Sequence, residues 1–125
     1  MKTRLAILLW SVSVDRPELA AAPFVYASAA CAMDCEVEIH FAGSAVRLLE
    51  PGVADALFNP AEPDYPIGWF MRNAARAGAR FYGCGMALHT HGLAGRELIP
   101  EYTGAAGAAA FVARTLDEEW ATMIF

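Results

Sequence analysis

Leu5-Ala6-Ile7-Leu8-Leu9-Trp10 is an unbroken apolar run of strand length near the start of this 125-residue chain. A strand that is covered by helices on both faces has this composition. The run is too short to cross a bilayer, which needs about 20 apolar residues. Asp15, Arg16 and Glu18 follow it, where a signal peptide would be apolar or small and neutral. The run therefore predicts a buried strand of a parallel sheet.

Segments typical of helices and strands alternate after this run. Helices are expected over residues 15–32, 67–77, 96–102 and 105–116, strands over 35–41, 79–83 and 120–125, a helical turn at 86–91, a strand or helical turn at 46–49, and a proline-rich loop at 59–66. Pro23 would delay the first helix or bend it, and Gly78 would end the second. This alternation predicts a single domain over residues 1–125, an α/β three-layer sandwich with a mostly parallel sheet.

The segment Cys35–Phe41 differs from the first strand because apolar residues alternate in it with Glu36, Glu38 and His40. Such alternation indicates a strand with one wetter face, near the edge of the sheet. Nothing in the sequence sets the three polar residues apart chemically. They are interpreted as a solvated or interface face and not as a general acid–base pair.

Composition narrows the function before any motif is considered. The chain is 57% hydrophobic, which excludes a disordered protein, and only 18% charged, below the quarter usual for a soluble domain. Contacts between subunits would hide the excess apolar surface. The net charge is −5 without a basic stripe, so no nucleic acid is expected as a partner. Three cysteines do not form a disulfide framework and favour a reducing compartment.

The strongest chemical signal lies in residues 81–92, where Cys84 stands between Gly83 and Gly85 as a strand passes into a helix. Ligands bind at this end of the strands in open α/β sheets. The glycines permit a tight turn and close approach to the sulfur, and free N–H groups at the helix start favour a thiolate. The alternative is a structural cysteine in a crowded turn, since free cysteine is among the most buried residues.

Two histidines lie near Cys84 in the sequence, and two further cysteines carry the same thiol group. Cys84, His89 and His91 could supply three metal ligands, but their spacing matches no zinc pattern, so neither a metal nor a cofactor is expected. The two histidines are more readily exposed or capping residues than proton relays. Cys31 and Cys35 are interpreted as structural thiols, and the alternative is a resolving thiol for Cys84.

The whole order of elements resembles one known family. An apolar strand, a helix, a second strand and a long loop are followed by Ala79–Leu88, Gly92-Leu93, Glu97–Ile99, an alanine-rich helix and a strand ending at Phe125. This order is similar to that of the DsrE/DsrF-like family of sulfur-relay proteins. The resemblance implies a compact α/β sandwich that forms trimers or hexamers. It also implies a cytoplasmic cysteine that accepts sulfane sulfur as a persulfide, and Cys84 falls at its position.

Three functions are therefore weighed. The first is a sulfur carrier or sulfurtransferase, a homotrimer or homohexamer with sulfur donor and acceptor proteins as partners and with neither membrane nor nucleic acid. Its catalytic residue is Cys84, and its binding residues are Gly83, Gly85, Met86, His89 and His91. The second is a non-catalytic oligomeric module that binds a small ligand or partner segment, in which the thiol is incidental. The third and weakest is a metal-binding protein.

Overall fold

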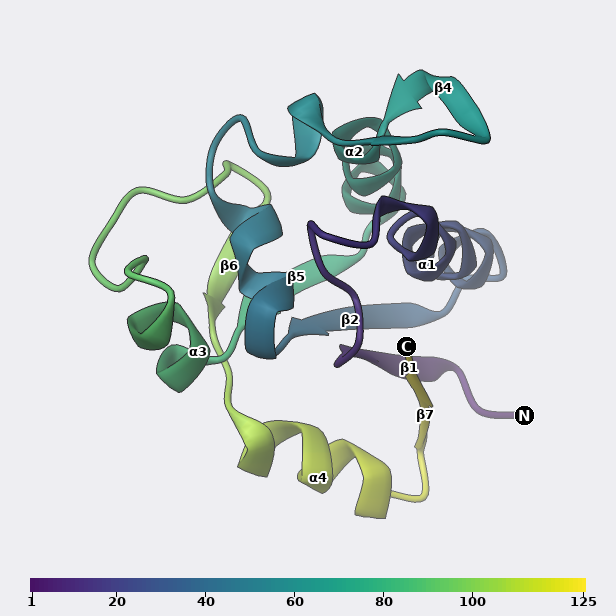
Figure 1. The fold of residues 1–125 in the computed structure, drawn as a ribbon. Helices are drawn as coiled ribbons and strands as arrows, with labels where there is room; N and C mark the ends of the chain where they lie inside the picture. Colours follow the sequence, from purple (N-terminus) through teal and green to yellow (C-terminus); the bar gives the residue numbers. More distant parts are fainter.

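Five parallel strands form the centre of the structure, a computed structural model that describes residues 1–125 (Figure 1). The strands are β1 (Arg4–Leu9), β2 (Glu36–Phe41), β5 (Arg80–Gly83), β6 (Tyr102–Ala105) and β7 (Trp120–Ile124). Their order across the sheet is β6-β5-β2-β1-β7, and every pairing is parallel. The predicted α/β fold is thus confirmed, and all five carboxyl ends lie at one edge of the sheet.

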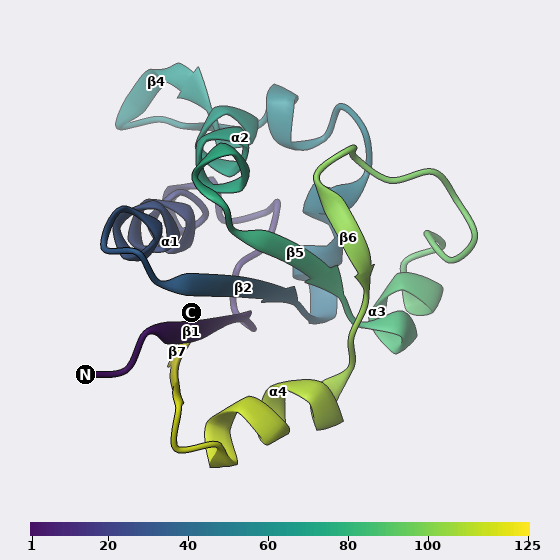
Figure 2. The same cartoon turned by 180° about the vertical axis from the view of Figure 1, so that it is seen from behind.

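Helices cover both faces of this sheet unequally. The helices α1 (Ala22–Ala32) and α2 (Ile67–Ala77) lie on one face, and α4 (Ala108–Leu116) lies alone on the other (Figures 1 and 2). The chain builds β1, β2, β5 and β6 in one direction and then returns to place β7 beside β1. Because parallel crossovers are right-handed, a connection that reverses direction must cross the opposite face. This reversal explains why α4 stands apart.

Short elements complete the chain around these layers. They are three 3₁₀ segments, η1 (Pro17–Leu19), η2 (Gly43–Leu49) and η3 (Ala54–Ala56), the hairpin strands β3 (Phe58–Asn59) and β4 (Glu62–Pro66), and the six-residue helix α3 (Gly85–Thr90). The helix α3 lies at the carboxyl edge of the sheet (Figure 1). No helix combines the length and the apolar character that a membrane crossing requires.

The main core lies between the sheet and the α1–α2 layer. It contains 22 buried residues, and Phe24 of α1 meets Phe41 and Phe81 of the sheet with ring centroids 6.0 Å away. A second cluster of three buried residues, Ala6, Phe111 and Trp120, lies under α4. The apolar strand predicted from the first residues therefore serves both layers, with Ile7 facing one and Ala6 facing the other.

Several elements differ from the sequence-based expectations. The strand β2 is central in the sheet and not near its edge, and Glu38 and His40 are buried because α4 covers their face. The helix expected at 96–102 is wrong: this segment is a loop that leads into the edge strand β6, where pairing with β5 outweighs local helix preference. The expected loop at 59–66 contains the β3–β4 hairpin.

Other local predictions hold. Pro23 delays the first helix, which begins at Ala22 after the separate turn η1, and residues 43–49 are helical turns. The helix α2 ends at Gly78, whose φ of 120° is a conformation that residues with a side chain rarely adopt.

The two glycines beside Cys84 have different roles. A Cβ on Gly83 would lie 3.2 Å from side-chain atoms of Leu49, Leu88 and Tyr102, whereas a Cβ on Gly85 would meet nothing within 4 Å. Neither glycine has a positive φ. Gly83 is therefore needed for close packing behind Cys84, and Gly85 leaves open space beside it.

We expect Gly83→Ala to lower the free energy of unfolding by about 1–2 kcal/mol, because the added methyl group strains a well-packed turn. Gly85→Ala is the matched control and should stay within about 0.5 kcal/mol of the wild type. Urea denaturation of the three proteins measures both effects. Equal losses in the two variants would contradict the packing role of Gly83.

Candidate functional site

A cavity of about 400 Å³ opens at the carboxyl edge of the sheet. Residues just beyond four strands line it: Trp10 follows β1, Ala42 and Gly43 follow β2, Cys84 follows β5, and Ala106 follows β6. The remaining walls come from the ends of β1 and β2 and from α3, α4 and the residues next to them, and most of the lining is apolar. This edge is where open α/β sheets bind ligands, so we treat the cavity as the candidate site and call it the Cys84 pocket.

Cys84 is held in the wall of this pocket by its backbone. Its N–H donates to the carbonyl oxygen of Phe41 at 2.9 Å, and its own carbonyl oxygen accepts from the N–H of Leu88 at 2.9 Å. The residue therefore joins the end of β2 to the first turn of α3. Its side chain is half-buried, is not in a disulfide and caps no helix N–H. Cys84 therefore lines the pocket with a free thiol.

The structure brings some of the predicted site residues together and separates others. Met86 and His91 line the pocket with Cys84. Gly83 and Gly85 adjoin Cys84 in the chain but are not in the pocket wall, and His89 is exposed on α3 outside it. No group of three or more His, Cys, Asp or Glu side chains is placed to hold a metal ion.

Cys31 and Cys35 lie at the opposite edge of the sheet. Cys35 immediately precedes β2, whereas Cys84 is bonded to Phe41 at the far end of the same strand. At about 3.3 Å per strand residue, roughly 20 Å separates the two edges. Burial, followed by the nearby thiol of Cys35, raises the pKa of Cys31. Neither thiol can resolve a sulfur species on Cys84 of the same chain, and the structural interpretation of this pair is retained.

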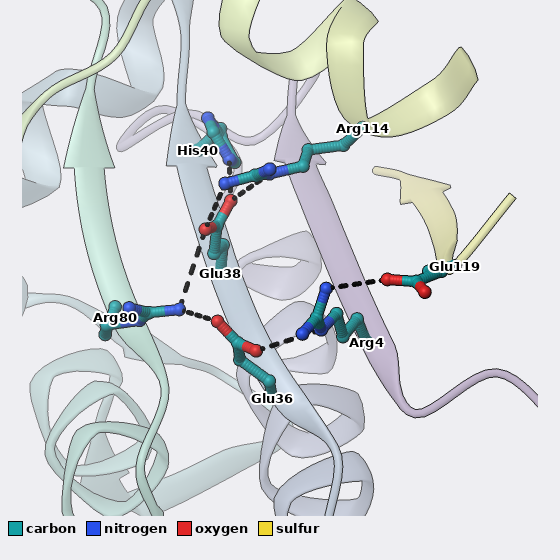
Figure 3. Close-up of polar contacts among 7 residues, drawn as sticks. All are labelled: Arg4, Glu36, Glu38, His40, Arg80, Arg114 and Glu119. Atoms are coloured by element: carbon teal, nitrogen blue, oxygen red, sulfur yellow. Dashed lines mark hydrogen bonds and ion pairs between the residues drawn. The ribbon is translucent and has the colours of Figure 1, made fainter. Parts of the chain in front are cut away.

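A buried polar cluster lies on the α4 face of β2, next to the pocket (Figure 3). Arg114 of α4 donates from Nε and Nη2 to the two carboxylate oxygens of Glu38 at 3.1 and 3.0 Å. His40 Nε2 lies 3.1 Å from Glu38 Oε1, and Arg80 lies 3.7 Å from Glu38 Oε2. Only 3% of Glu38 and 4% of His40 is exposed. His40 also lines the Cys84 pocket, so the cluster reaches the candidate site.

The charges within this cluster follow from its hydrogen bonds and burial. Burial alone would raise the pKa of Glu38, but the hydrogen bonds from Arg114 and His40 outweigh it and hold that pKa below its usual range. Burial lowers the pKa of His40, and its contact with Glu38 offsets this only in part. At neutral pH the cluster therefore contains a carboxylate, a guanidinium and a neutral imidazole.

Ion pairs extend from the cluster along the sheet toward the solvent. Arg80 also pairs with Glu36, Arg4 lies 3.3 Å from Glu36, and Arg4 donates to Glu119 at 2.9 Å (Figure 3). These outer pairs are exposed, and such pairs contribute little to stability, with a median of about 0–1 kcal/mol. The outer pairs orient side chains around Glu38, and the buried part of the cluster is the part that touches the pocket.

Sequence reasoning missed His40 and Glu38 as site residues. The signal was present as two ionisable residues at alternate positions of a strand, but the same pattern describes a solvated face. Whether this face is a buried site or a solvated surface is decided by Arg114, which contacts Glu38 from a helix 76 residues further along the chain. Only the reversal of the chain at β7 puts α4 on this face, and no local pattern encodes that reversal.

Comparison with known proteins agrees with this geometry. The sequence model of the DsrE/DsrF-like family matches residues 6–125, so the chain belongs to this family, which is linked to sulfur relay. Among solved structures, the chain is similar to the YchN protein from E. coli (TM-score 0.64, 15% identity, 100% of both chains covered). It is also similar to MTH1491, a protein of unknown function from Methanobacterium thermoautotrophicum (TM-score 0.68, 17% identity, 98% of both chains). At these identities the likeness shows the fold. No curated protein matches the sequence.

The lowered pKa of His40 predicts a loss of stability in acid. Because unfolding restores the ordinary pKa near 6.5, the unfolded chain binds more protons at this site, and stability falls as the pH drops below that value. We expect the urea concentration at the midpoint of unfolding to decrease as the pH is lowered from neutral to about 5. His40→Gln, which can still donate to Glu38, should lose less over the same interval. An equal loss in both proteins would show that His40 is not the group responsible.

Proposed function

We propose that this protein is a sulfur carrier with sulfurtransferase activity, in which Cys84 accepts sulfane sulfur as a persulfide and passes it to a partner protein. One observation supports the proposal above the others. The thiol of Cys84 is half-buried in the wall of a pocket at the ligand-binding edge of the sheet, in a chain of a family linked to sulfur relay. A reactive cysteine must be reachable, and this one opens onto a cavity.

The proposed transfer needs no cofactor. The Cys84 sulfur attacks the outer sulfur of a donor persulfide, a new S–S bond forms to Cys84, and the S–S bond of the donor breaks. The inner sulfur of the donor leaves as a thiolate and takes up a proton, so no net oxidation occurs. A disulfide-length bond places the carried sulfur about 2 Å beyond the Cys84 sulfur. The pocket has room for that atom and for the end of a donor or acceptor.

The same pocket supports a second candidate function, a module that binds a small apolar ligand. Its volume of about 400 Å³ is in the range of small-molecule sites and is larger than one carried sulfur atom requires. Its walls include the apolar side chains of Leu8, Trp10, Phe41, Phe111 and Val112. In this case Cys84 would be a wall residue and not a nucleophile.

We also propose that the chain works as a homotrimer or homohexamer in the cytoplasm. Large apolar side chains are exposed around the pocket and on or near α4: Trp10, Met86, Val112, Leu116 and Ile124. Exposed apolar side chains in such numbers favour contacts between proteins. The three free cysteines suit a reducing compartment. Light scattering that gives the mass of a monomer at working concentration would overturn the assembly.

Incubation with a persulfide donor should add the mass of one sulfur atom to the peptide that carries Cys84. Cys84→Ser should abolish the addition, because serine cannot form the persulfide, and Cys31→Ser/Cys35→Ser should retain it. Mass spectrometry of intact and digested protein measures all three. Sulfur that settles on Cys31 or Cys35, or none on the wild type, would argue against the relay.

Binding of the neutral dye Nile red tests the second function. If the pocket is a ligand site, Cys84→Ser should keep the dye affinity within about twofold. Ala108→Trp, which fills the pocket from α4, should weaken it about tenfold. Fluorescence titration gives both affinities. If the dye affinity is the same in Ala108→Trp as in wild type, the dye binds elsewhere and the support for a ligand module is removed.

A further inference from the structure

The Cys84 pocket contains a buried ring nitrogen that has no partner. His40 lines the pocket, and its Nδ1 atom makes no hydrogen bond. A buried polar atom left unpaired costs roughly 1–3 kcal/mol, and such atoms call for an explanation when they persist in a folded protein. Nδ1 has almost no exposed surface, so it can act only on a group that lies directly against the ring, such as a neighbouring side chain of the pocket wall.

The neighbours of His40 assign its proton. Glu38 is a carboxylate because Arg114 binds both of its oxygens, and an ionised carboxylate can only accept hydrogen bonds. The contact between His40 Nε2 and Glu38 therefore requires the proton on Nε2. The neutral ring then carries its lone pair on Nδ1. The unpartnered atom is an acceptor, that is, a base.

The register of the sheet places this base near Cys84. His40 pairs with Tyr82 of β5, and the two rings stack with centroids 5.5 Å apart. Since side chains alternate along a strand, Tyr82 and Cys84 share a face, and His40 and Cys84 are diagonal neighbours on it. His40 and Cys84 both line the Cys84 pocket, so a thiol and an imidazole that extend toward each other can meet in it. Nε2 faces Glu38, toward the amino end of β2, and Nδ1 lies on the other side of the ring.

We propose that His40 is the proton-transfer residue of the Cys84 site, with Nδ1 taking the thiol proton as the Cys84 sulfur attacks a sulfane-sulfur donor. This inference rests on the proposed relay and adds its acid–base step. The new S–S bond forms as that of the donor breaks, and His40 then returns the proton to the departing thiolate. The products are the Cys84 persulfide and the donor thiol, so the step needs neither an oxidant nor a reductant. Glu38 and Arg114 are positioning residues, because they act on the thiol only through His40.

The surroundings of His40 suit a base that works at neutral pH. Burial lowers the pKa of His40, so the ring is neutral and able to accept a proton. The titratable and charged groups around it are Glu38 on β2, Arg114 from α4, Tyr82 and Cys84 from β5 and its turn, His91 across the pocket, and Arg80 through Glu38. Of these, Glu38 is the group that stabilises the imidazolium once it forms, and Arg114 opposes it.

The test compares wild type with His40→Gln, both in a Cys31→Ser/Cys35→Ser background so that Cys84 is the reporter. Glutamine can keep the hydrogen bond to Glu38 but has no basic atom. We expect sulfur transfer from benzyl persulfide to be about 100-fold slower in His40→Gln near neutral pH. The difference should vanish at strongly alkaline pH, where the thiol ionises unaided. The pH profile of iodoacetamide labelling should shift to higher pH in the same variant.

Two further variants guard against a folding defect. Tyr82→Phe is the matched control, since it keeps the ring that stacks on His40, and it should leave the pH profile unchanged. Glu38→Gln removes the carboxylate that sets the tautomer, and it should slow transfer about tenfold near neutral pH with the same convergence in alkali. Circular dichroism confirms that each variant is folded.

The results separate the base from the relay itself. Profiles of wild type and His40→Gln that coincide, or that differ by one factor at every pH, overturn the proton-transfer role, and sulfur still found on Cys84 would leave the relay standing. If Cys84 accepts no sulfur in wild type but its labelling profile still depends on His40, the relay is overturned and the assignment of His40 as the base for this thiol is supported.

Discussion

The carboxylate of Glu38 is buried in the central strand of the sheet, and it stays there because Arg114 reaches it from α4. Removing one partner from a buried pair leaves a charge without compensation and costs several kcal/mol, so strand and helix are tied to each other. The guanidinium also lies 4.2 Å from the ring centroid of Trp120 on β7. One side chain thus joins the helix, the central strand and the last strand. The wall of the Cys84 pocket depends on this junction, because α4 supplies Phe111 and Val112 to it.

Much of the fold is predictable from particular residues. The apolar residues 5–10 predict a strand buried on both faces, and Gly78 predicts the end of α2, because each signal is local. The strand β6 was missed because Tyr102–Ala105 is short and becomes a strand only by pairing with β5. The position of β2 in the sheet was misjudged because alternating apolar and polar residues indicate that the two faces of a strand differ. The pattern does not indicate what covers the polar face.

The candidate site, like the fold, is partly predictable from local sequence patterns and partly dependent on tertiary packing. Cys84 stands out in the sequence because a cysteine between glycines at a strand end has a recognisable pattern, and the structure places it in the pocket. His40 enters the site through register and through the helix packed over it, and both are tertiary facts. The sequence predicts that a glycine is needed at position 83 because of its backbone freedom. The structure gives another reason, since three neighbouring side chains leave little room for a larger residue and the backbone needs no positive φ. Sequence patterns located the candidate thiol, and packing supplied its neighbours.

The unequal helix layers have a further consequence for how this protein can change. The sheet acts as a partition, with 22 buried residues on one side and only three, beside the polar cluster, on the other. Most of the apolar burial that sustains the fold is thereby separated from the side chains that face the pocket, although Phe41 and Ala87 belong to both. The small cluster can be rebuilt around a new ligand or partner while the large one continues to hold the five strands in register. A scaffold divided in this way can diversify its chemistry at little risk to its architecture.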